Sequence, residues 1–273
     1  MKKQNLIKRT LFRNKKIAVC SIIVLIFAFI GIFGPFFVVD PMEFSGYPLE
    51  PPSLAHPLGT DIFGRDLFSW LVYGIRNSMI VGAIAGGISL LIAITMGGLS
   101  GYLRGLVGEF FNAIINIFLV IPVVPLLIIL STLAKERSLL LVALFIGCVT
   151  AWPGAARAIR AQVLSLREKE FINLAMLTGK GSKSIIFGEI FPNMISYILL
   201  QFCGAFANAM VAEAGISLIG LGPANIPTLG MMLHWSIRSL TILLGIWWWF
   251  VPPGVALIIL SGALYTISIS YEK

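Results

Sequence analysis

Apolar runs of about 20 residues alternate along the chain with short polar, basic or Pro/Gly-rich connections. A run of this length is what an α-helix needs to cross the hydrocarbon of a bilayer. The pattern therefore predicts an all-α integral membrane protein. It has six expected transmembrane helices, at residues 17–39, 78–103, 110–134, 139–158, 194–219 and 252–270.

Composition supports this class of protein and excludes a soluble one. The chain is 58% hydrophobic and only 12% charged, against about 25% charged in ordinary globular domains. The formal net charge is +8, but nucleic-acid binding would need the basic residues on one soluble face. Here the basic residues lie at the ends of the apolar runs. The expected partner is therefore the lipid bilayer, and no nucleic-acid partner is expected.

The basic residues also predict the orientation. With six spans and both termini on one side, that side carries 15 of the 20 Lys and Arg. Basic residues favour the cytoplasmic side of a membrane. Residues 1–16 are then a basic cytoplasmic N-terminus, the C-terminus is also cytoplasmic, and residues 17–39 are a retained first transmembrane helix, since no cleavage site of a signal peptide follows them. The expected location is the plasma membrane of a prokaryotic cell.

Two loops stand out between the spans. Residues 40–77 form an extracytoplasmic loop, followed by a five-helix core at 78–273. In its polar segment, Gly59 and Gly64 permit turns, and Asp61 and Asp66 can pair with Arg65. The loop is interpreted as a structural clasp, with direct contact to cargo as the alternative.

The longest cytoplasmic connection, residues 157–193, predicts a helix, a turn and a second helix. An apolar stripe at 166, 171, 174 and 177 favours a first helix over 166–178, ended by Gly179. The second is expected to start at Ser182 as its cap and to end at Pro192. Ala175 and Gly179, one turn apart, would let another protein approach the backbone closely; the alternative is an amphipathic helix resting on lipid headgroups.

Helix breakers and polar residues inside the spans leave alternatives open. Pro122, Pro125 and the Trp152-Pro153-Gly154 segment either kink helices for packing or mark a path that opens and closes. Gln201, Gly204, Asn208 and Glu213 in the fifth span either pack against another helix or face a pathway. With so few intramembrane acids, an ion-coupled secondary carrier is the alternative class rather than the favoured one.

Other chemistry is sparse. The chain has no G-x-x-x-x-G-K-[ST] motif for binding ATP, no G-x-S-x-G motif and no metal-ligand spacing of its Cys and His residues. No enzyme activity, metal or cofactor is therefore expected in this chain. Residues 247–250, three Trp and one Phe, are interpreted as an anchor at the membrane interface, with stacking on sugar rings as the alternative.

Three sequence blocks resemble one family. Glu170 to Gly179, followed at 13 residues by Pro192, resembles the "EAA" loop of ABC importer permeases. The E-A-A positions are Asn173, Leu174 and Ala175 here, and Ala175, Gly179 and Pro192 follow the family pattern. The outer loop resembles the signature of C-type permeases of the dipeptide/oligopeptide/nickel family, at His56, Pro57, Leu58, Gly59, Thr60, Asp61, Gly64, Arg65 and Asp66. The segment from Glu213 to Gly222 resembles a third family block.

The resemblance implies a type I ABC importer permease fold and a set of partners. These are a second, B-type permease in a heterodimer, two cytoplasmic ATPases that bind ATP and magnesium, and an extracytoplasmic solute-binding protein. The implied ATPase-coupling residues are Glu170, Asn173, Leu174, Ala175, Gly179, Ser182 and Pro192. The implied cargo is a di- or oligopeptide, with oligosaccharides and nickel complexes as alternatives.

Overall fold

The computed structural model describes residues 15–133, 138–223 and 225–270, and its regular elements there are helices and short helical turns. Several of the basic residues behind the predicted orientation lie outside the described residues: most of the N-terminus, Lys135, Arg137 and the last three residues. The structure therefore does not show on which side these charges lie. The elements are α2 (Lys15–Phe33), η1 (Gly34–Phe36), α3 (Leu67–Tyr102), α4 (Leu106–Val120), α5 (Val123–Leu133), α6 (Leu139–Val149), α7 (Trp152–Arg167), α8 (Glu170–Leu177), α9 (Ser182–Ile185), η2 (Ile186–Ile190), α10 (Phe191–Asn193), α11 (Ile195–Leu218), α12 (Leu229–Arg238) and α13 (Trp247–Ile269).

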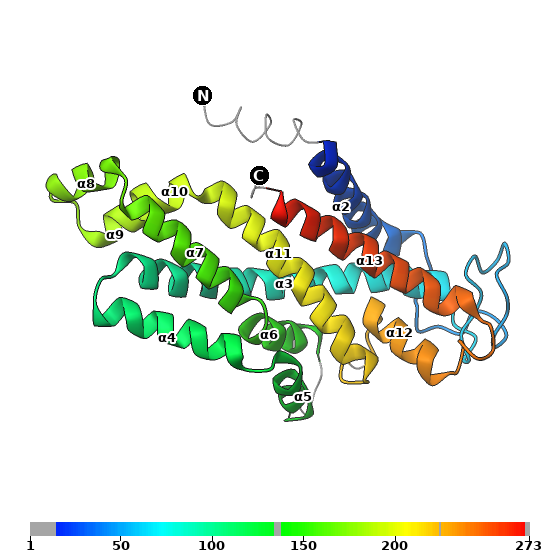
Figure 1. Ribbon diagram of the computed structural model, residues 1–273. Coiled ribbons are helices and arrows are strands. Elements are labelled where there is room, and N and C mark those ends of the chain that lie inside the picture. Colours follow the sequence, from blue (N-terminus) through cyan, green and yellow to red (C-terminus); the bar gives the residue numbers. More distant parts are fainter. Residues whose placement is uncertain (1–14, 134–137, 224, 271–273) are drawn as a thin grey trace.

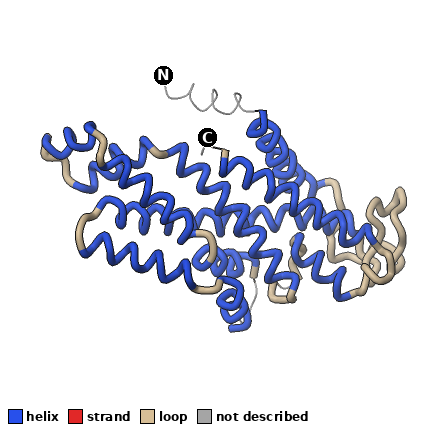
Figure 2. Tube along the Cα trace, in the orientation of Figure 1, coloured by secondary structure: helices blue, strands red, loops and turns tan. Residues whose placement is uncertain are grey.

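The described helices confirm up to six membrane spans. Four are long and apolar enough to cross a bilayer: α2 together with η1, α3, α11 and α13. Two bent helix pairs, α4 with α5 at 83° and α6 with α7 at 46°, bring the number to six if each pair crosses the membrane once. The breaks fall at Pro122 and just before Trp152-Pro153, so the predicted helix breakers do interrupt these two spans (Figure 2).

Three span boundaries differ most from the prediction. α3 begins at Leu67 rather than at residue 78, because Asp66 caps it and the polar pair Arg76-Asn77 lies inside the helix. The fourth span extends through α7 to Arg167. α13 begins at Trp247 rather than at Pro252; a proline near the start of a helix costs one backbone bond but does not have to end the helix.

The helix α3 lies at the centre of the bundle. It contacts α2, α4, α6, α7, α11, α12 and α13. Glycines make this close packing possible: a Cβ at Gly97 would overlap the Ala156 carbonyl of α7, and one at Gly82 would overlap the Phe206 ring of α11. Small residues at such crossings are typical of helices that pack in membranes.

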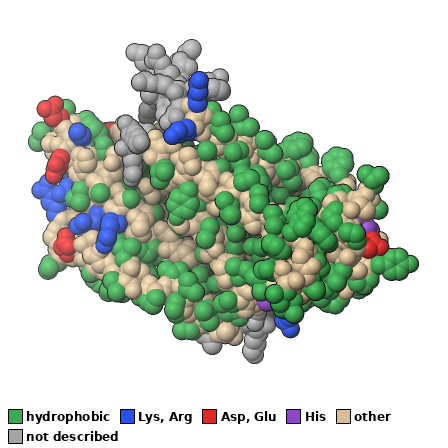
Figure 3. Space-filling view, turned by 45° about the vertical axis from the view of Figure 1, so that its right-hand side comes forward, with side chains coloured by type: hydrophobic (Ala, Val, Ile, Leu, Met, Phe, Trp, Pro, Cys, Tyr) green, Lys and Arg blue, Asp and Glu red, His purple; other side chains and the backbone are tan. Residues whose placement is uncertain are grey.

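The bundle has two distinct ends (Figure 1). One end carries α8, α9 and α10, and we call it the α8 end. The other carries the loop before α3 and the connection between α12 and α13, and we call it the clasp end. Figure 3 shows hydrophobic side chains over the middle of the visible face and charged side chains gathered toward the ends, as expected for a membrane protein.

Candidate functional site

The connection from α7 to α11 carries α8 at its tip (Figure 1). Gly179 has a left-handed backbone, with φ of 78°. Its amide donates to the Met176 carbonyl at 3.0 Å, and the Lys180 amide donates to the Ala175 carbonyl at 3.2 Å. These two bonds form a Schellman motif. The prediction that Gly179 ends this helix is confirmed.

The two faces of α8 have different environments. Ile172 and Ala175 are buried in the cluster that includes Ile185 and Ile190. Leu174 and Leu177 are 61% and 84% exposed. The prediction of Ala175 as an open approach for a partner is therefore wrong, since its side chain faces the bundle. The exposed residues of α8 also include Glu170 and Asn173.

The predicted continuous helix over 166–178 is also wrong. α7 ends at Arg167 and α8 begins at Glu170, with the Lys169 amide donating to the Leu166 carbonyl in the turn. The break changes the helical register, so Leu166 does not share a face with Leu174 and Leu177. Because the apolar residues fit a helical spacing, the sequence alone did not reveal the break.

The second half of the connection is short and irregular. Gly181, not Ser182, is the cap of α9, and no side chain bonds to its first amides. The π-helical turn η2 follows, and the Phe191 amide donates to the Ile186 carbonyl, five residues back. Pro192 comes next and has no amide hydrogen, which disfavours a regular α-helical turn. The predicted second helix is therefore divided into three short helical segments, α9, η2 and α10, instead of one continuous helix.

Arg167 ties this connection to α3. Its guanidinium donates to the carbonyls of Gly101 and Tyr102, at 3.2 and 3.0 Å. These are carbonyls at the C-terminal end of α3, which lack intrahelical donors. Sequence reasoning counted Arg167 only as a positive charge; its place in the last turn of α7 gave no sign of this partner. The connection is thus bonded to α3 as well as joined to α11.

At the clasp end, the loop before α3 is held by its own side chains, and we call residues 40–66 the clasp. Asp61 is buried and forms an ion pair with Arg65, whose Nε lies 2.6 Å from Oδ2. The other oxygen, Oδ1, accepts from the amides of Phe63 and Arg65. The Arg65 guanidinium also lies 4.8 Å from the ring centre of Trp70.

Asp66 joins the clasp to α3. Its Oδ2 accepts from the Ser69 amide and hydroxyl, at 2.7 and 2.6 Å, so it caps the helix. Its Oδ1 lies 3.1 Å from Nδ1 of His56. The Thr60 hydroxyl, fully buried, donates to the Tyr47 carbonyl and accepts from the Glu50 amide.

Two glycines of the clasp are required by its geometry. Gly59 and Gly64 have φ of 70° and 76°. A Cβ at either position would overlap a carbonyl oxygen, that of Glu50 or that of Gly46. With Pro57 and Leu58 between His56 and these turns, the block folds on itself, and its polar side chains bond within the loop. This geometry favours the structural clasp over direct contact with cargo.

Glu213 packs between helices, the first of the two alternatives drawn from the sequence. It is fully buried, and its carboxylate accepts from the hydroxyls of Ser217, Thr228 and Ser78, at 2.6, 2.7 and 3.3 Å. Ser78 in turn accepts from the Leu229 amide at the start of α12. The node joins α3, α11 and α12. Only Ser217, four residues after Glu213, could have been anticipated from helical spacing.

The other predicted pathway residues of α11 lie on a different face. Asn208 is exposed and hydrogen-bonds to the Tyr265 hydroxyl of α13. A Cβ at Gly204 would approach the Ser268 hydroxyl of α13. Gln201 is half-buried. This face therefore packs partly against α13 and is partly open, so it keeps both of the alternatives drawn from the sequence.

Two further predictions concern metals and the aromatic cluster. Within residues 15–133, 138–223 and 225–270, no group of three His, Cys, Asp or Glu is placed to hold a metal ion. Of the three tryptophans, Trp247 is 55% exposed while Trp249 is buried with Leu67, Trp70 and Met232. The interpretation of residues 247–250 as an interfacial anchor was wrong for Trp249. Because α13 already begins at Trp247, Trp249 lies on the helix face that packs against the core.

Comparison with known proteins identifies the family. Residues 91–271 match the family described as "Binding-protein-dependent transport system inner membrane component". The chain belongs to this family. It is a binding-protein-dependent transport permease, a multi-pass protein of the plasma membrane.

Relatives extend the likeness over nearly the whole permease. The oligopeptide transport system permease protein OppC of Mycobacterium tuberculosis (strain H37Rv) is 30% identical over 97% of this chain and 91% of its own. The dipeptide transport system permease protein DppC of Bacillus subtilis (strain 168) is 32% identical over 86% and 74%. DppC of Alkalihalophilus pseudofirmus is 35% identical over 82% and 74%. The family match spans α8 and Glu213, and the match to OppC extends over more of the permease.

Proposed function

We propose that this permease forms half of the translocation pathway of an ATP-driven importer of di- and oligopeptides. Its partners are a second, different permease, two cytoplasmic ATPases that hold ATP and magnesium, and an extracytoplasmic solute-binding protein. The peptide cargo is proposed because the relatives are named for oligopeptide and dipeptide transport. In this proposal, cofactor binding and ATP hydrolysis belong to the ATPases rather than to this chain.

The observation that carries the proposal is the exposed apolar face of α8. Leu174 and Leu177 project from the tip of the bundle, where lipid does not cover them if the membrane surrounds the apolar middle. Exposed leucines on one face of a helix are typical of a helix that docks into a groove of another protein. We assign that groove to an ATPase. Gly179 has open space around its Cα, so a bulky residue such as tryptophan there would project toward the partner.

The connections of α8 supply a mechanism for coupling. Ile172, Ala175 and Ile185 bind the segment into one cluster, and Arg167 bonds it to α3. The chain continues through Pro192 into α11. When ATP brings the ATPases together, α8 moves with the docking groove and shifts α3 and α11, so the nucleotide biases the pathway between two states. The partly open face with Gln201 and Asn208 is our proposed wall of that pathway.

The proposal includes an orientation. The α8 end carries exposed Lys169, Lys180 and Lys183, which favours the cytoplasmic side. Both termini are then cytoplasmic, and the clasp faces the solute-binding protein.

The test replaces exposed leucines at opposite ends. Leu174→Arg with Leu177→Arg should abolish ATPase co-purification and peptide uptake while the permease still reaches the membrane. Leu243→Arg is the matched control, because Leu243 is 81% exposed at the clasp end. Retention of both ATPases by the double variant would overturn the proposal. An ion-coupled carrier would instead lose uptake when the proton gradient collapses and keep it when ATP is depleted.

A further inference from the structure

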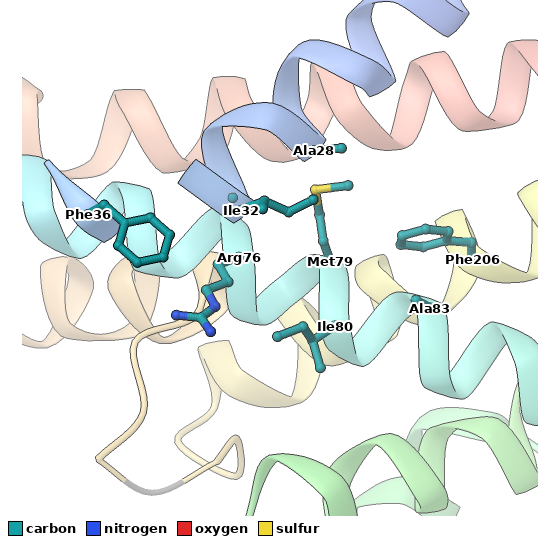
Figure 4. Close-up of a pocket in the computed structure, with 9 residues that line it drawn as sticks. Ala28, Ile32, Phe36, Arg76, Met79, Ile80, Ala83 and Phe206 are labelled. Atoms are coloured by element: carbon teal, nitrogen blue, oxygen red, sulfur yellow. The ribbon is translucent and has the colours of Figure 1, made fainter. Parts of the chain in front are cut away.

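A groove opens between α2, α3 and α11 (Figure 4). Its volume is about 530 Å³, within the range of about 300–1,000 Å³ that small-molecule sites occupy. The apolar lining comes from all three helices and includes Ala28, Ile32, Ile80, Ala83 and Phe206.

One cation, Arg76, interrupts this apolar lining. Among the described residues, its side chain has neither a hydrogen bond nor an ion pair. Figure 4 shows the side chain leaving α3 between Phe36 and Ile80. An arginine at membrane depth normally has an anionic or carbonyl partner. The part of the chain that the structure describes therefore supplies the groove with a cation but with no anion to pair with it.

The depth of Arg76 follows from its neighbour on α2. The span of Lys15–Phe36 is 22 residues, or about 33 Å of helix, close to the roughly 30 Å of bilayer hydrocarbon. A Cβ at Gly31 would lie 3.3 Å from the Arg76 Cα, so the two backbones meet there. Gly31 is five residues, about 7.5 Å of helix, before Phe36. From that level an arginine side chain reaches the headgroup boundary by extending along the span.

We infer that this groove binds an anionic phospholipid. Its phosphate pairs with the Arg76 guanidinium, which can donate two parallel hydrogen bonds to phosphate oxygens, and one acyl chain lies along the apolar lining. A single membrane lipid thus provides both the anion for Arg76 and the acyl chain that fills the apolar volume. With the orientation of the proposed function, this lipid lies in the outer leaflet; the site itself does not depend on that proposal.

Other occupants fit less well. A peptide cargo would bring several backbone amides, and the lining offers Arg76 as its one charged group, so those amides would be left without partners. A transmembrane helix of the second permease has a diameter of about 10 Å, so this volume holds only four or five of its residues. It would also need an acid placed against Arg76.

The test measures bound lipid on the permease complex. The complex is extracted in mild detergent, incubated with vesicles of phosphatidylglycerol or of phosphatidylcholine, re-isolated and examined by native mass spectrometry. The wild-type complex should retain phosphatidylglycerol and not phosphatidylcholine. Arg76→Gln should lose the retained lipid and Arg76→Lys should keep part of it. Ala83→Trp should also lose it, by filling the apolar part of the groove.

Arg238→Gln is the control, since Arg238 is an exposed arginine at the clasp end that lies over Trp235. It should retain as much lipid as the wild type. Equal retention by Arg76→Gln, or equal loss by Arg238→Gln, would overturn the inference. So would loss of the second permease, or of a bound peptide, from Arg76→Gln with the lipid still present. ATPase co-purification is scored in the same samples, so a failure of the proposed function is seen separately.

Discussion

The two ends of this permease satisfy their polar groups in opposite ways. At the clasp end, Asp61, Asp66 and Thr60 are buried and bonded to groups of the same loop or of α3. At the α8 end, the ion pair between Lys180 and Glu189 is partly open to solvent, and Leu174 and Leu177 are exposed. The buried polar groups of the clasp are satisfied within this chain, although Phe44, Tyr47 and Leu54 are exposed there, whereas α8 presents exposed leucines on a short helix at the tip of the bundle. The contrast separates a structural region from a docking region.

The largest expected effect is at the Asp61–Arg65 pair. Asp61→Asn removes the charge that Arg65 faces and leaves a partly buried cation unpaired. A loss of about 4 kcal/mol in stability is expected, since breaking a buried pair typically costs about 3–5 kcal/mol. Thermal unfolding of the purified permease in detergent measures it. A variant that melts like the wild type would show that the clasp is not held by this pair.

Two glycines give a matched comparison between the ends. Gly64→Ala and Gly179→Ala both place a side chain at a left-handed backbone position, which costs about 1–2 kcal/mol. At Gly64 the new Cβ also overlaps the Gly46 carbonyl, while at Gly179 it meets open space. Gly64→Ala should therefore lose about 3 kcal/mol and Gly179→Ala about 1 kcal/mol. Equal melting temperatures would contradict this account of the two turns.

The Glu213 node is expected to contribute less than the clasp. Glu213→Ala leaves three buried hydroxyls without their acceptor, and the loss should be about 2 kcal/mol. Glu213→Gln keeps one acceptor oxygen and should be milder. Limited proteolysis of the connection between α11 and α12 reports the effect, because the node fixes Thr228 there. If the alanine variant resists the protease as well as the wild type, the node does not hold α12.

The smallest effect is predicted for the exposed pair at the α8 end. Lys180→Gln should change stability by less than about 1 kcal/mol, as is usual for surface ion pairs. The melting temperature should stay within error of the wild type, and added salt should have little influence. A loss as large as that of Asp61→Asn would remove the distinction between the two ends.

Hydrophobic patterning predicted the spans well, because about 20 apolar residues are needed whatever the packing. It did not predict the start of α3, because Arg76 and Asn77 lower the local hydropathy. The helix begins eleven residues earlier than predicted, at Leu67, with Asp66 as its cap. The break at Glu168 and Lys169 also escaped the pattern. Helical spacing continues across those two residues in the sequence, but the backbone does not.

The candidate sites were predicted in part. Gly179 and the clasp residues were found because glycines and paired charges have local signatures. The burial of Glu213 depends on Ser78 and Thr228, which lie 135 and 15 residues away in the chain, and no local pattern reports such contacts. Arg167 and its carbonyl partners on α3 were missed for the same reason.

The most direct test of the docking claim is photo-cross-linking in intact membranes. A benzoylphenylalanine is placed at Leu177 in one sample and at Leu243 in the other, both highly exposed and at opposite ends. After irradiation, mass spectrometry identifies the linked proteins. The account predicts a P-loop ATPase linked at 177 and none at 243. Cross-links from 177 to lipid alone, with the ATPases present in the membrane, would contradict it.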